Sequence, residues 1–186
     1  MPSAVETIRM IIHPAKTEEM SMIYFIADTH FGDERILRYE NRPFESADAM
    51  DRELIRRWNE TVSPEDTVYV LGDWGKLSPA LLRGRKYLIK GNHDTLDNRS
   101  YRNMGFAEVY DLPVILEEFW LLSHQPLYVC ENMPYANLFG HVHASPLYKT
   151  FSSQHYCVSA ERIDYTPVSF DAIRQHIQAK RPLDYS

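Results

Sequence analysis

YLIKGNHD, residues Tyr87 to Asp94, joins a short apolar run to a polar loop. The apolar run predicts a buried strand, and the polar residues predict a loop at its carboxyl end. In this loop Gly91 permits a close backbone approach, the amide oxygen of Asn92 can ligate a metal, and the imidazole of His93 lies next to a carboxylate. The stretch therefore predicts a reactive site at the end of a strand.

Four further polar stretches each follow an apolar run of their own. They are Asp28-Thr29-His30, Gly72-Asp73, Ser123-His124 and Gly140-His141-Val142-His143. Nearly continuous apolar runs, such as residues 22–27 and 67–71, are typical of strands that are buried on both faces. The runs at residues 109–110, 113–116, 119–123, 136–139 and 156–159 predict further strands, and we expect this half of the chain to be largely antiparallel.

Apolar residues at helical spacing predict a helix from Ser46 to about Glu60 and a terminal helix capped by Ser169, and a short helix is predicted through Pro79 to Leu82. With 186 residues, 44% of them hydrophobic, the chain suits one domain over residues 22–186. Residues 1–21 carry no motif and form an N-terminal extension. They could add an edge strand or an arm, or lie upstream of a start at Met20 or Met22.

The charge and hydropathy of the chain limit its partners. A net charge of -6 and a pI near 5.7 argue against a protein that holds nucleic acid tightly, because such binding needs a basic face. No stretch approaches the roughly 20 apolar residues that a membrane span requires. We therefore expect a cytoplasmic protein with no membrane and no stable nucleic-acid complex.

The strand-end loops supply two aspartates, one asparagine and five histidines as candidate site groups: Asp28, His30, Asp73, Asn92, His93, His124, His141 and His143. Such a set, without cysteine, suits Mn, Fe or Zn better than Mg²⁺ or Ca²⁺. The ligands are too many for one ion. Two ions at roughly 3.5–4 Å from each other would share a bridging carboxylate, clamp a phosphate and lower the pKa of a bound water.

The spacing within two of the motifs also has a geometric reason. In a strand-like segment, residues two apart point to the same side. Asp28 and His30 can therefore reach into one cleft, and so can His141 and His143.

These motifs, in this order, resemble the calcineurin-like metallophosphoesterase family: D-x-H, G-D, G-N-H-D, a lone histidine after an apolar strand, and G-H-x-H. The resemblance spans about residues 22–143, and the tail through Tyr165-Thr166-Pro167 and the last helix also looks like that of small single-domain bacterial and phage members. It implies an α/β fold of two mixed β-sheets packed face to face and flanked by helices, a four-layer αββα sandwich. It also implies a dinuclear metal centre at the strand ends.

The resemblance further implies a role for each matching residue. The first metal would be held by Asp28, His30, Asp73 and His143, with Asp73 as the bridge, and the second metal would be completed by Asn92, His124 and His141. His93, its ring oriented by Asp94, would contact a phosphate oxygen or protonate the departing alkoxide. The reaction would be an in-line attack of metal-bound hydroxide on phosphorus.

Three residues near the motifs bear on substrate binding. The small family members tend to read D-T-H-F-G-H in the first loop, whereas Asp33 stands here at the sixth position and removes a possible phosphate-facing cation. Arg42 is a candidate phosphate clamp, although an arginine in a solvated loop is the more common situation. Trp74 is either a packing residue or a stacking surface for an aromatic group of the substrate.

The leading hypothesis is a dinuclear phosphoesterase that acts on a small phosphodiester or phosphomonoester, a nucleotide being one option. Diesters are slightly favoured, because His93 could protonate a poor leaving group. A protein-interaction module on the same scaffold is one alternative, and a DNA nuclease is another. Metal identity and oligomeric state are left open by the sequence.

Overall fold

The computed structural model describes residues 21–130, 133–148 and 152–180. The prediction for the N-terminal extension therefore lies outside the described residues, apart from Ser21.

The first of two β-sheets in the described residues is built mainly from parallel strands. The strand order of this sheet is β4-β3-β2-β1-β9. Its strands are β1 (Ile23–Ile26), β2 (Thr67–Val70), β3 (Arg85–Ile89), β4 (Glu108–Tyr110) and β9 (Val168–Ser169). β1 to β4 are parallel, and β9 pairs antiparallel with β1.

The second sheet has the strand order β5-β6-β7-β8. Its strands are β5 (Val114–Leu116), β6 (Trp120–Ser123), β7 (Ala136–Phe139) and β8 (His155–Cys157). β5 pairs antiparallel with β6 through a turn at Glu117-Glu118, but β6, β7 and β8 are parallel. The expectation of a largely antiparallel half was therefore wrong. The connections after β6 and β7 are long enough to cross over between parallel strands, which hairpin turns cannot do.

Among the described residues, four α-helices and three short 3-10 helices accompany the strands, and all but α4 lie between strands in the sequence. They are α1 (Glu34–Tyr39), α2 (Ala47–Thr61), α3 (Asn98–Met104), α4 (Phe170–Lys180), η1 (Pro79–Leu81), η2 (Pro146–Tyr148) and η3 (Ala160–Arg162). α2 confirms the predicted helix, since the Ser46 hydroxyl accepts a 3.1 Å hydrogen bond from the Ala49 amide. No helix in the described part of the chain is long and apolar enough to cross a bilayer.

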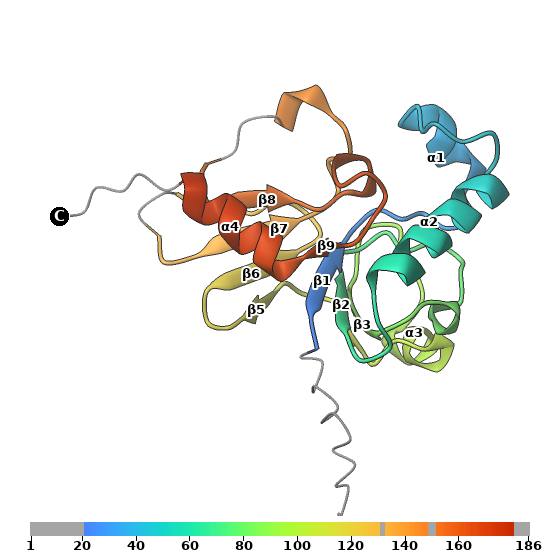
Figure 1. Cartoon of the computed structure of the whole chain (residues 1–186), viewed down its shortest axis with the longest axis horizontal. Helices are drawn as coiled ribbons and strands as arrows, with labels where there is room; N and C mark the ends of the chain where they lie inside the picture. Colours follow the sequence, from blue (N-terminus) through green and yellow to red (C-terminus); the bar gives the residue numbers. More distant parts are fainter. Residues whose placement is uncertain (1–20, 131–132, 149–151, 181–186) are drawn as a thin grey trace, which may run out of the picture.

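Two hydrophobic cores lie on the two faces of the first sheet. Alternation along β2 sends Val68 and Val70 toward Leu54 and Trp58 of α2, whereas Leu71 belongs to the core shared with the second sheet. In Figure 1, α1, α2 and α3 lie on one side of β1–β3 and the strands β5–β8 on the other. The predicted α/β sandwich of two mixed sheets flanked by helices is confirmed.

α4 contributes to the core between the sheets. Phe170 packs edge-on against Phe25 of β1 at a centroid distance of 5.3 Å and against Trp120 of β6 at 5.0 Å. One aromatic side chain thus joins the two sheets. The carboxyl ends of the parallel strands in these two sheets carry the polar motifs.

Candidate metal centre

The polar stretches that the sequence singled out come together at the carboxyl ends of β1, β2, β3, β6 and β7. Asp28 follows β1 and Asp73 follows β2 in the first sheet, while His124 and His141 follow β6 and β7 in the second. The two sheets meet here: the His141 amide donates a 2.9 Å hydrogen bond to Asp28 Oδ2, and His124 Nδ1 lies 3.8 Å from Asp28 Oδ1. All seven predicted metal ligands lie in this cluster.

One part of the cluster is a tight triangle of donor atoms. Asn92 Oδ1 lies 2.9 Å from His124 Nε2 and 3.0 Å from His141 Nδ1, and the two ring nitrogens are 3.1 Å apart. Bonds of about 2.1 Å to one transition-metal ion at right angles would separate neighbouring donors by about 3.0 Å. Because His124 Nδ1 is 2.9 Å from the Leu71 carbonyl, it donates to that oxygen and leaves Nε2 with a free lone pair. The triangle fits a metal ion.

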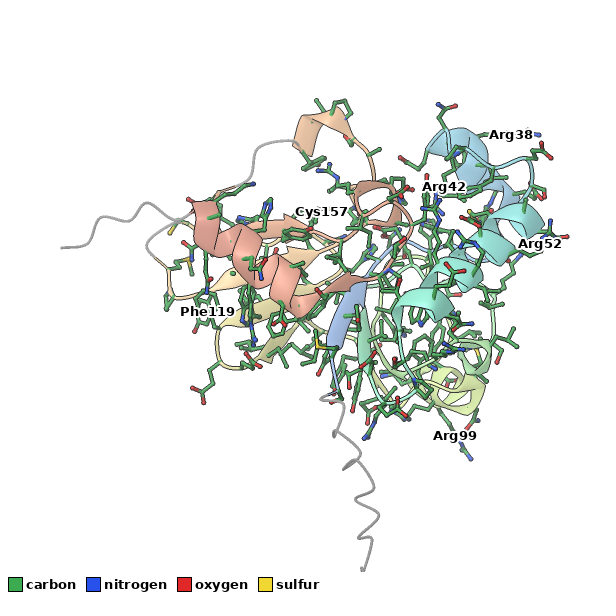
Figure 2. The ribbon with its side chains drawn as sticks, viewed as in Figure 1. Arg38, Arg42, Arg52, Arg99, Phe119 and Cys157 are labelled. Carbon is green, nitrogen blue, oxygen red and sulfur yellow. The ribbon has the colours of Figure 1, made fainter. Side chains whose placement is uncertain are left out.

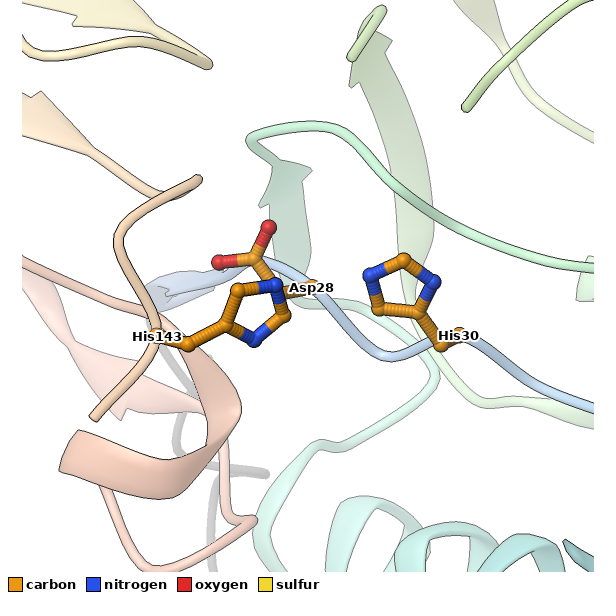
Figure 3. Close-up of side chains that lie close together, drawn as sticks. All are labelled: Asp28, His30 and His143. Carbon is orange, nitrogen blue, oxygen red and sulfur yellow. The ribbon is translucent and has the colours of Figure 1, made fainter. Parts of the chain in front are cut away.

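A second group consists of Asp28, His30 and His143, which offer ligand atoms that all lie within 4.8 Å of one another. Figure 3 shows their side chains approaching one another from two separate segments of the chain. His30 Nε2 is buried and has no hydrogen-bond partner among the described residues. Such an orphaned buried nitrogen is costly unless it has a ligand to bind. This group therefore also fits a metal ion.

Asp73 lies between the two groups. Its Oδ2 atom is 3.5 Å from His30 Nε2 and 3.5 Å from His124 Nε2, one nitrogen from each group. Its Oδ1 atom accepts a 2.9 Å hydrogen bond from the His93 amide. A carboxylate in this position is able to bridge two ions, as the resemblance implied.

The backbone of the candidate ligands is strained. Five of them have left-handed φ angles, between 46° and 69°: Asp28, His30, Asp73, His141 and His143. Left-handed conformations are unfavourable for residues other than glycine and concentrate at functional sites. The paired residues lie in one cluster, as expected, but the strand-like geometry assumed for them was wrong. The chain turns at each of these ligands instead of extending through them.

Two glycines permit the loops to approach the ligands. A Cβ atom on Gly72 would overlap the His124 ring, and one on Gly91 would overlap Asp73 Oδ1. Gly72 also has a φ angle of +89°, which a side chain would strain. These positions explain why glycine precedes the aspartate in one motif and the asparagine in the other.

The electrostatics of the centre favour a bound cation. Burial raises the pKa of Asp28 to about 6, although the imidazoles of His143 and His124 act in the opposite direction. Burial lowers the pKa of His30 to about 4 against the effect of the Asp73 carboxylate, and burial also lowers the pKa of His141. A cation would lower the raised pKa of Asp28 and would use the lone pairs of the neutral rings.

His93 and Asp94 do not act as the predicted pair. The side chain of His93 is 59% exposed, and its Nε2 atom lies 4.0 Å from Asp73 Oδ2 at the edge of the centre. Asp94 is buried, and its carboxylate accepts hydrogen bonds from the amides of Asp73, Gly91 and Trp74 at 2.8 to 3.0 Å. The prediction that Asp94 orients the His93 ring was wrong. Asp94 instead joins the loops that follow β2 and β3.

Arg42 belongs to the segment that links α1 to α2 (Figure 2), and its side chain is buried. Its guanidinium donates to the carbonyls of Asp28 and Thr29 and to the carboxylate of Glu161. The structure corrects the predicted phosphate clamp, because the donors of Arg42 are turned to these protein acceptors. Asp33 also has a structural role, since it caps α1 by accepting a 2.9 Å hydrogen bond from the Arg35 amide.

Trp74 is fully buried and packs against Phe31, Trp58 and Phe106 at centroid distances of 4.9 to 6.0 Å. Its indole N–H donates a 2.7 Å hydrogen bond to the Leu77 carbonyl. The predicted stacking surface for substrate was therefore wrong, and the packing alternative is confirmed. A residue next to a candidate ligand need not face the site.

Glu161 is a site residue that the sequence did not reveal. Its Oε1 atom accepts a 3.0 Å hydrogen bond from His143 Nδ1 and pairs at 2.6 Å with Arg42 Nη2. Burial alone would lower the pKa of His143, but the hydrogen bond to Glu161 and the charge of Asp28 outweigh it and raise that pKa. Burial alone would raise the pKa of Glu161, but His143 and Arg42 lower it. A carboxylate that orients a histidine in this way supports metal ligation through the other ring nitrogen.

The sequence of the chain is similar to that of a known protein over most of its length. The chain is 34% identical to the uncharacterized protein MJ1445 of Methanocaldococcus jannaschii over 176 residues, which cover 86% of the chain and 93% of that protein. The chain therefore belongs to the same family as MJ1445. A shorter region, 40% of the chain, is 33% identical to the Gene 66 protein of Mycobacterium phage L5 and covers 41% of that protein.

The crystal structure of AQ665, a protein of unknown function from Aquifex aeolicus, is similar to this fold with a TM-score of 0.65 at 26% identity. The similarity covers 83% of this chain and 98% of AQ665. No family model matches the chain. The names of these relatives state no activity.

Proposed function

We propose that the protein is a metal-dependent phosphoesterase of the calcineurin-like type, which holds two transition-metal ions and hydrolyses a small phosphodiester or phosphomonoester. The observation that carries the proposal is the position of Asp73. Its Oδ2 atom lies 3.5 Å from a nitrogen of each ligand group, where one carboxylate can serve two ions. Manganese, iron and zinc all suit this set of histidine, aspartate and asparagine donors.

The bound ions would supply positive charge for a phosphate group and would lower the pKa of a water molecule. The residues of the chain would perform the remaining steps. Asp28 and Asp73 would hold the ions in a buried position, and Glu161 would keep the His143 ring in one tautomer. The exposed His93 imidazole, at the edge of the centre, is able to contact a phosphate oxygen or to protonate the departing oxygen. Because hydrolysis of a diester must release an alkoxide, which is a poor leaving group, a proton donated by His93 slightly favours diesters as substrates.

The first test is metal binding and ester hydrolysis by the full chain. We expect the protein to bind Mn²⁺, Fe or Zn²⁺ and, with Mn²⁺, to hydrolyse bis-p-nitrophenyl phosphate or p-nitrophenyl phosphate. Asp73→Asn should lower kcat/KM by at least about a hundredfold, since it removes the charge shared by both ions. Asp164→Asn is a matched control, because the side chain of Asp164 is 86% exposed and lies outside the centre.

A protein that binds none of these metals and hydrolyses neither ester nor any nucleotide would contradict the proposal. Full cellular function of Asp73→Asn and His93→Ala variants would point instead to an interaction module. A scaffold that only binds another protein needs neither the shared carboxylate nor the exposed imidazole.

A further inference from the structure

A cavity of about 240 Å³ lies beside the candidate centre, between the carboxyl ends of β3 and β6. Its lining includes Asn92 and His124, whose Oδ1 and Nε2 atoms are 2.9 Å apart in the triangle of donors. A molecule bound beside this triangle would therefore have the cavity directly next to it. Sites for whole drug-sized ligands measure about 300–1,000 Å³, so this cavity suits one ring-sized group and not a complete ligand.

The apolar part of the lining comes from three separate segments of the chain. Ile89 ends β3, Leu112 and Pro113 connect β4 to β5, and Leu127 follows β6. Apolar walls of this kind stabilise a group that leaves water on binding. They favour a ring over a strongly hydrated group such as a second phosphate.

The cavity also has a polar pair. Lys90 Nζ lies 3.0 Å from Asp111 Oδ1, and both residues line the cavity. The ammonium group is a donor and the carboxylate is an acceptor, while their charges cancel. Gln125, which also lines the cavity, adds an amide that both donates and accepts. This chemistry matches an uncharged group with its own hydrogen-bond donors and acceptors.

We propose that this cavity binds the organic group of the substrate ester, and that this group is an uncharged ring carrying hydrogen-bond donors and acceptors. The inference rests on the proposed phosphoesterase function and names the class of ester that the centre accepts. The phosphate lies beside the donor triangle, whose lone pairs serve the metal ion, and the ring lies between the apolar walls with its polar edge toward Lys90 and Asp111. Phosphate esters of small alkyl groups leave the cavity unfilled and bind more weakly.

The test uses the full chain loaded with Mn²⁺ and two non-hydrolysable probes, methylphosphonate and phenylphosphonate. Both carry the same charged group, and calorimetry measures their affinities without any need for turnover. We expect phenylphosphonate to bind about tenfold or more tightly, because its ring buries apolar surface. Leu112→Trp should reduce this preference to about twofold or less, since the indole would occupy the cavity.

The position of Leu112 makes the variant informative. Leu112 is 74% exposed, so its replacement does not disturb the core. Ile115→Trp is the matched control, because Ile115 is 54% exposed and does not line the cavity. A Leu112→Trp variant that keeps the full preference would overturn the assignment of the cavity, as would equal binding of the two probes by the wild type. If Mn²⁺ binds but neither phosphonate does, the proposed phosphoesterase function itself is wrong.

The polar edge has its own test. The probe 4-carbamoylphenylphosphonate adds a neutral donor and acceptor to the ring, and we expect it to bind about fivefold or more tightly than phenylphosphonate. Lys90→Met should remove most of this gain. An equal affinity for the two ring compounds in the wild type would overturn the hydrogen-bonding part of the proposal.

Discussion

The two groups of candidate ligands orient their histidines by different means. In the donor triangle, the ring of His124 is fixed by the backbone carbonyl of Leu71 at 2.9 Å. In the other group, the ring of His143 is fixed by Glu161, which is itself paired with the buried Arg42. A carbonyl stays in place as long as the strand does, whereas a buried ion pair depends on both of its side chains. One group is therefore held by the backbone of the fold, and the other by side chains.

The largest expected effect comes from removing the cation of that ion pair. Arg42→Met would leave the Glu161 carboxylate unpaired and the carbonyls of Asp28 and Thr29 without their donor. We expect the free energy of unfolding to fall by about 3–5 kcal/mol, as when one partner of a buried pair is removed. Urea denaturation measures this change. Arg52→Met, at an exposed position of α2, should alter it by no more than about 0.5 kcal/mol.

If Arg42→Met were as stable as the Arg52→Met control, the ion pair would contribute little, and the contrast between the two groups would fail. A stability loss without any change in metal binding would limit the role of Arg42 to folding.

A more selective change is Glu161→Gln. The amide oxygen still accepts from His143 Nδ1, but the negative charge that faces Arg42 is lost. We expect the affinity of one metal ion to fall about 10- to 100-fold while the other ion binds as in the wild type, because partners of this kind tune the ligand that they orient. Calorimetric titration with Mn²⁺, fitted with two sites, measures both affinities. Equal weakening at both sites would show that the groups are not supported independently.

The site was predictable where each motif is local in sequence. Asp28, Asp73 and Asn92 each follow an apolar run within a few residues, so the pattern itself places them at strand ends. Glu161 is different, because its partner Arg42 lies 119 residues away and neither residue belongs to a motif. Contacts of this range are made by the folded chain and leave no local signal.

The same limit applies to parts of the fold. Apolar runs revealed the strands of the second sheet, but a run does not encode the direction of its neighbour, and the parallel order of β6, β7 and β8 was missed. The helices α1 and α3 have only 6 and 7 residues, too few for a clear helical period. The sequence could not decide between the two roles of Trp74, because Phe31, Trp58 and Phe106, which bury it, belong to three separate segments.

The donor triangle, which is held by the backbone, depends on a glycine at position 72. Gly72→Ala would introduce a Cβ atom that overlaps the His124 ring and would strain a φ angle of +89°. Gly32→Ala is a matched control, since its φ angle is +72° but its Cβ would meet only ordinary contacts at 3.6 Å and beyond. We expect each variant to lose about 1–3 kcal/mol from the strained backbone, and only Gly72→Ala to weaken one Mn²⁺ site as well. Identical metal titrations for the two variants would show that the close approach is not needed.

The smallest expected effect is at Asp33, in the loop that Arg42 also supports. Asp33 caps α1, and its hydrogen bonds with Arg35 lower its pKa to about 2. We expect Asp33→Ala to cost about 1 kcal/mol of stability at neutral pH, as for other helix caps, and Asp33→Asn to cost less because asparagine also caps helices.

The contribution of Asp33 should depend on pH. A carboxylate with a lowered pKa stabilises the fold fully at pH values above its unfolded pKa near 3.9, and this contribution is lost as the pH falls toward about 2. The difference between wild type and Asp33→Ala should therefore shrink over that range in urea denaturation. A large loss of phosphonate binding with no loss of stability would instead assign Asp33 to the substrate, and the loop after β1 would then serve binding as well as support.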